Sequence, residues 1–119
     1  MLRVMSAFQE FALIFRPTRP LDPADMPRRN ASAREWALAL HREGILSYAT
    51  PLESEGIRVR ETGTLPVDEE TSIGAVLVIR ANDLDAAAAL AKTHPSLVYG
   101  IEIEARLVKA VVLPRRTTD

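Results

Sequence analysis

Two stretches of the chain are apolar at nearly every position. They are "FQEFALIFRP" at residues 8–17 and "AVLVIRA" at residues 75–81. A strand that is apolar on both faces has to be covered on both sides, so these stretches predict two central strands of a sheet. Three further strands are expected where apolar and polar residues alternate or cluster between turn residues, at residues 45–52, 56–61 and 100–112.

Two helices are expected between these strands. For the first, "SARE" has the spacing of a capping box, which predicts a start at Ser32 and an end at Gly44. The second helix is expected to have Asn82 as its N-cap, to carry an inner stripe of small side chains and to end before Pro95. Residues 17–31 hold four of the eight prolines together with several arginines, and they predict a long stiff loop before the first helix.

The order of elements is therefore strand, helix, strands, helix, strand. This order predicts an α+β fold with a ferredoxin-like, split βαβ protomer, in which two helices cover one face of an antiparallel sheet. The second face would stay open, and a second copy of the chain is the simplest cover. We therefore expect a homodimer, a dimeric α/β barrel in which the two sheets face each other. The 119 residues fit one domain, with its core at residues 8–110 and a polar tail at residues 114–119.

Composition narrows the classes of partner. The net charge is −1 and the isoelectric point is about 6.1, which argues against a nucleic-acid partner and against a polybasic membrane anchor. There is no cysteine, so disulfides and thiolate chemistry are excluded. The apolar run near the N-terminus is too short for a signal peptide or a membrane helix, and we expect a cytoplasmic protein with no membrane partner. No phosphate-binding glycine motif or nucleophile elbow is present, and no cofactor is expected.

The two histidines are the first candidates for chemistry. His94 directly precedes the proline that ends the second predicted helix. In one interpretation it is a protonated cap, stabilised by the helix dipole by about 0.3–1 kcal/mol. In the other it faces a pocket as a general acid/base or ligand contact, oriented by Asp68, Glu69 or Glu70. His41 lies off the apolar stripe and is expected to be solvated. The two histidines lie far apart without a third ligand in register, so no metal site is expected.

The remaining candidates are the tryptophan and two charged sets. Trp36, the only tryptophan, is expected in the core, in the wall of an aromatic pocket, or in both. One charged set surrounds the proline-rich loop and either binds an anion or forms a solvated surface: Arg16, Arg19, Arg28, Arg29 and Arg34. The other set either forms cross-strand ion pairs or lines a polar cavity between two sheets: Arg58, Arg60, Glu102, Glu104 and Arg106.

Three segments together resemble the YCII-related domain family: "REWALALHREGILSYATPLES", "IGAVLVIRANDLDAAAALAKTHPSL" and "YGIEIEARLV". The resemblance spans residues 11–108. It implies a dimeric α/β barrel of ferredoxin-like protomers with a small-molecule pocket between helices and sheet. A few relatives look like enzymes that act on small, often aromatic, compounds.

This chain departs from the family pattern at the positions that carry its chemistry. Some relatives have a histidine–aspartate pair suggested as catalytic, and motif alignment places Ala33 and His94 at those positions here. An acid that orients an imidazole raises its basicity, and the pair is not present in that form. The Asp-Gly-Pro-Phe signature of one subfamily is also missing near residues 65–67.

These observations predict a homodimeric, YCII-related small-molecule-binding protein without assigned catalysis. The expected ligand-binding residues are Phe15, Arg16, Trp36 and His94, in a pocket gated by the loop at residues 17–29. One alternative is a lyase or isomerase of a small cyclic or aromatic compound, with His94 as its catalytic general acid/base. Another alternative is a structural dimerisation or regulatory module.

Overall fold

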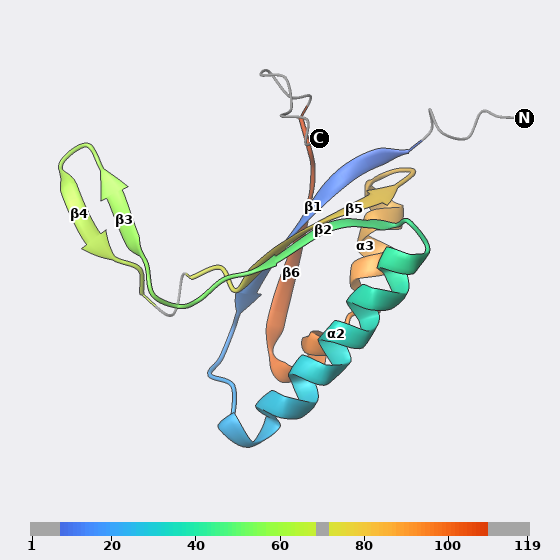
Figure 1. Ribbon diagram of the computed structural model, residues 1–119. Coiled ribbons are helices and arrows are strands. Elements are labelled where there is room, and N and C mark those ends of the chain that lie inside the picture. The colour runs from blue at the N-terminus through green and yellow to red at the C-terminus, as the bar shows by residue number, and fades with distance from the viewer. Residues whose placement is uncertain (1–7, 69–71, 110–119) are drawn as a thin grey trace, which may run out of the picture.

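The computed structural model of the chain describes residues 8–68 and 72–109 (Figure 1). The α-helices are α2 (Met26–Arg42) and α3 (Leu84–Ala91), and two short 3-10 helices lie beside them, η1 (Pro23–Asp25) and η2 (Pro95–Tyr99). The strands are β1 (Gln9–Pro17), β2 (Leu46–Pro51), β3 (Ile57–Arg60), β4 (Gly63–Pro66), β5 (Ala75–Ala81) and β6 (Ile101–Leu107).

Four of the strands form one sheet in the order β2-β5-β1-β6, and every neighbouring pair is antiparallel. β1 lies inside the sheet, where Phe15 is in register with Ala75 of β5 and Ile103 of β6. The units β1-α2-β2 and β5-α3-β6 therefore interleave. The predicted α+β fold, a four-stranded antiparallel sheet with two helices, is confirmed.

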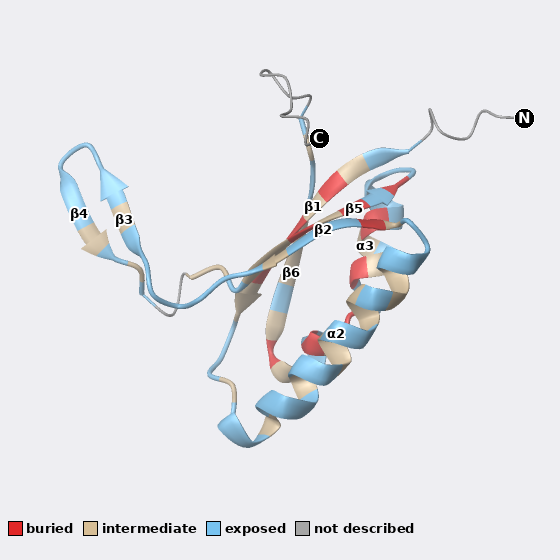
Figure 2. Cartoon of the chain, viewed as in Figure 1, coloured by how far each residue is buried: buried red, intermediate tan, exposed pale blue. Residues whose placement is uncertain are grey.

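The core lies between the sheet and the two helices, which cover the same face (Figures 1 and 2). Period-two alternation turns three residues of β1 toward the helices, where all are buried: Phe11, Leu13 and Phe15. Ala87 and Ala91 of α3 are also buried, and their small side chains let this short helix lie close to the sheet. The intervening residues of β1 face the other side, which neither α-helix covers.

The first helix begins earlier than predicted. α2 starts at Met26, and Pro27 lies in its first turn, where a missing N–H costs no hydrogen bond. Ser32 is inside the helix, and its hydroxyl donates to the carbonyl oxygen of Arg28 at 3.0 Å. The predicted start at Ser32 is wrong, and so is the predicted loop over residues 23–31, because Pro23 and Pro27 lie in the first turns of η1 and α2.

The second helix and the last strand also differ in detail. The N-cap of α3 is Asp83, whose carboxylate accepts a hydrogen bond from the Ala86 amide at 2.8 Å; the prediction of Asn82 was wrong. β6 ends at Leu107, and the last three residues of the strand expected at 100–112, as well as the tail at 114–119, lie outside the described residues. The end of α2 is as predicted, because Gly44 has a φ of +76°. Within the described residues, neither helix is both long and apolar enough to span a membrane.

The predicted strand at residues 56–61 does not join the main sheet. β3 pairs with β4 in a separate hairpin, which we call the arm (residues 57–66). The arm projects away from the end of β2, on the side of the sheet opposite the helices (Figure 1). Arg58 and Arg60 are therefore not cross-strand neighbours of the charged residues of β6, contrary to one of our expectations.

Candidate functional site

Three of the four predicted ligand-binding residues meet in an aromatic cluster between the sheet and α2. Phe15 comes from β1, Trp36 from α2 and His94 from the junction of α3 and η2. The ring centroid of His94 lies 4.8 Å from that of Phe15 and 4.5 Å from that of Trp36. The indole N–H of Trp36 donates to the hydroxyl of Thr93 at 2.8 Å, which ties α2 to the end of α3.

His94 is a neutral cap at the start of η2. Its Nδ1 accepts a hydrogen bond from the backbone N–H of Ser96 at 3.0 Å, so the ring proton lies on Nε2. The residue is only 5% exposed, and burial together with the positive charge of Arg29 lowers its pKa from 6.5 to about 4. The interpretation of His94 as a protonated cap at a helix C-terminus is therefore wrong.

Arg29 is the one residue of the predicted arginine set whose charge acts on His94. Its buried Nε has no hydrogen-bond partner within the described residues. Of the acids expected to orient His94, Asp68 is not among the groups that shift its pKa, and Glu69 and Glu70 lie outside the described residues. No carboxylate of the described chain therefore raises the basicity of His94.

Arg16 is not brought to the cluster. It follows Phe15 on β1, so its side chain faces the open side of the sheet, where it forms an ion pair with Glu104 of β6. The same carboxylate group lies 3.8 Å from Arg106. Glu104 and Arg106 both belong to β6, so this pair of the second charged set lies within one strand, and the cross-strand partner of Glu104 is Arg16 of the first set.

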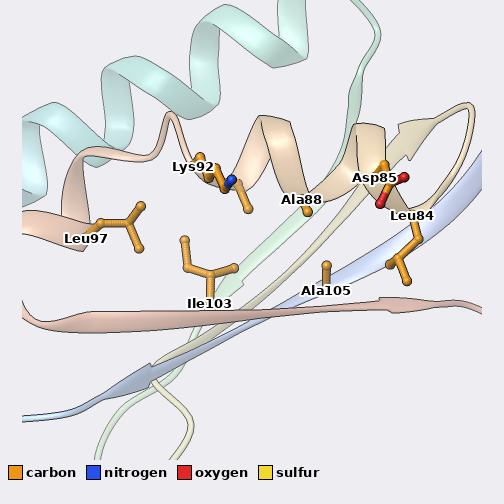
Figure 3. A pocket seen from close by; sticks show the side chains of 8 residues that line it. Leu84, Asp85, Ala88, Lys92, Leu97, Ile103 and Ala105 are labelled. Carbon is orange, nitrogen blue, oxygen red and sulfur yellow. The ribbon is translucent and has the colours of Figure 1, made fainter.

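The hollow nearest to the cluster is a groove between α3 and β6 (Figure 3). The ring of His94 packs against both Phe15 and Trp36, so it occupies the space predicted between them. The groove has a volume of about 410 Å³ and a mostly apolar lining, contributed by Leu84, Asp85, Ala88, Ala91, Lys92, Leu97, Ile103 and Ala105. It adjoins the cluster, because Ile103 is the register partner of Phe15.

The groove exists because small side chains face each other across it. Ala88 of α3 and Ala105 of β6 leave a space that larger residues would fill, while Lys92 and Asp85 place opposite charges along the helix side (Figure 3). We did not predict these residues as a site. The signal was the alanine-rich stripe of the second helix, which we interpreted as close packing alone. Within residues 8–68 and 72–109, no group of three or more His, Asp or Glu side chains could hold a metal ion.

No protein-family model matches the chain, and no curated protein sequence matches it. The resemblance to the YCII-related family therefore rests on the three quoted segments and stays a prediction.

Proposed function

We propose that the protein is a cytoplasmic small-molecule-binding protein of the YCII-related type, with its binding site in the groove between α3 and β6. The observation that carries this proposal is the groove itself. Its volume of about 410 Å³ lies within the range of small-ligand sites, and apolar walls with a few polar groups are typical of such sites.

The lining of the groove defines the class of ligand. Ala88, Ile103 and Ala105 give the groove apolar walls, which suit a compact cyclic or aromatic body. Lys92 adds one ammonium group at the Leu97 end, which favours an acidic substituent on that side of the ligand (Figure 3). The ligand that fits best is therefore a small aromatic or cyclic carboxylate.

The proposal includes a homodimer with the ferredoxin-like protomers of a dimeric α/β barrel. Support comes from the open face of the sheet, whose centre is apolar. There Ala12 and Ile14 of β1 lie in register with Val78 and Val76 of β5, and all four are only partly buried. Tyr48 of β2, in register with Val78, is exposed. An apolar sheet face of this kind is typical of a surface covered by another sheet.

The enzyme alternative has weaker support than binding. A general base has to accept a proton, but Nδ1 of His94 already accepts the Ser96 amide hydrogen bond. A pKa of about 4 also leaves the ring uncharged near neutral pH, so it is a poor proton donor. His94 in this state could only donate a hydrogen bond from Nε2. A structural dimerisation or regulatory module would need no ligand, and the following experiment distinguishes it from a small-molecule-binding protein.

The experiment is an NMR titration of the protein with 1-naphthoate, comparing wild type with Ala88→Phe and Ala89→Phe. Ala88 lines the groove, whereas its exposed neighbour Ala89 does not, so the two variants add the same ring inside and outside the site. We expect saturable shifts at Ile103 and Ala105, abolished by Ala88→Phe and kept by Ala89→Phe. Shifts that do not saturate, or equal binding by both variants, would contradict the proposal.

A further inference from the structure

The arm has an apolar face that the described chain leaves uncovered. Ile57 and Val59 point to the same side of β3, and they are 71% and 79% exposed. Arg58 and Arg60 alternate with them, a pattern typical of a strand with one buried face. β3 therefore has the sequence of a half-buried strand, but nothing in the described residues of a single copy covers Ile57 and Val59.

The arm is also too small to be stable without support. Its two strands have four residues each and pair with each other but with no strand of the main sheet. An isolated two-stranded hairpin is only marginally stable in water, and exposed β-branched residues on it favour association. A surface that covers Ile57 and Val59 would supply this support.

The position of the arm indicates a second copy of the chain. It lies on the same side of the main sheet as the open apolar face (Figures 1 and 2). It leaves the sheet at the end where Pro51 of β2 is in register with Ala75 of β5. We infer that the arm reaches around a second copy and buries Ile57 and Val59 against it. This inference rests on the homodimer of the proposed function.

The strand order indicates a particular arrangement of the two copies. A two-fold axis parallel to the strands, between two facing sheets, places the β2 edge of one copy over the β6 edge of the other at the same end. The end of β6 where Ile101 is in register with Pro17 lies at that same end. The arm of one copy therefore leaves its sheet beside the β6 edge of the other copy.

The first measurement is the dimer dissociation constant by sedimentation velocity, for wild type, Val59→Asp and Val98→Asp. Val98 is a matched control, because it is 75% exposed but lies on η2, on the helix side of the sheet. We expect a wild-type dimer of about 26 kDa, twice the chain mass of 13.1 kDa. Val59→Asp should weaken it by about tenfold or more, since the interface would bury an unpaired charge, and Val98→Asp should not weaken it.

A wild-type dimer that Val59→Asp leaves intact would overturn the arm contact while the dimer of the proposed function stands. A wild-type monomer at all concentrations would overturn both.

A second probe covers the case in which Val59→Asp merely unfolds the hairpin. The chain has no cysteine, so Val59→Cys and Val98→Cys each introduce a single thiol. At concentrations where the protein is dimeric, Ellman's reagent should react about tenfold more slowly at position 59 than at position 98, because the arm is covered. Equal rates would overturn the inference.

Discussion

We expect His94 to make the folded protein sensitive to mild acid. Burial and the charge of Arg29 lower its pKa from 6.5 to about 4, and the residue is 5% exposed. The folded state therefore keeps the ring neutral in a pH range where the unfolded chain binds a proton. This contribution to stability is fully present above about pH 6.5 and is lost as the pH falls from 6.5 toward 4.

The size of the effect follows from the two pKa values. Their difference corresponds to about 3 kcal/mol of stability, at about 1.4 kcal/mol for each pH unit. Between pH 7 and pH 5 the loss is about 2 kcal/mol, in a range where most carboxylates remain ionised.

The test compares wild type with His94→Asn. Asparagine keeps a side-chain oxygen that can accept the Ser96 amide hydrogen bond but does not titrate. Urea unfolding at pH 7 and pH 5, at one protein concentration, can be followed by the fluorescence of the only tryptophan, Trp36. We expect wild type to lose about 2 kcal/mol more than the variant. His41→Asn, on the exposed last turn of α2, should behave like wild type.

Equal losses in wild type and His94→Asn would refute this reasoning. An NMR titration of the folded protein in which His94 takes up its proton near pH 6.5 would also refute this reasoning.

Two further substitutions test the packing around the site. Leu13→Ala removes a fully buried side chain from the middle of β1 and should cost about 2–5 kcal/mol in urea unfolding; a loss below about 1 kcal/mol would contradict its place in the core. Trp36→Phe keeps a ring beside His94 but removes the donor to Thr93, and should cost about 0.5–1.5 kcal/mol. In a double-mutant cycle, Thr93→Val should cost less in the Trp36→Phe background than alone, and additive costs would mean that the hydrogen bond contributes nothing.

The strands of the main sheet were the most predictable part of the fold. The continuous apolar run at residues 75–81 has the bounds of β5, because Gly74 and Asn82 delimit it. The start of the first helix was not predictable in this way. "SARE" matches a capping box, and Pro27 suits a stiff loop as well as the first turn of a helix. Local signals supported both alternatives, and of residues 26–31 only Arg29 is partly buried, so no apolar stripe marks the earlier start.

The sequence predicted which residues meet in the aromatic cluster, but it did not predict the protonation state of His94. Phe15, Trp36 and His94 were expected together, and they meet. The protonation of His94 depends on burial and on Arg29, a residue 65 positions away along the chain, so no local pattern could give it. The groove was missed for a related reason. The groove forms because Ala88 and Ala105 have small side chains. These residues lie on α3 and β6, and only the tertiary structure shows that the two elements are neighbours.

The inner position of β1 has a consequence for folding during synthesis. β1 is made before both of its sheet neighbours, because β5 and β6 lie at residues 75–81 and 101–107. On the ribosome, the apolar side chains of β1 therefore have no strand to pair with until β5 has been translated. Such non-local pairing slows folding and leaves an unpaired apolar segment open to aggregation or to chaperones. A central strand of the fold is thus made before both of its partners and is among the last to be completed.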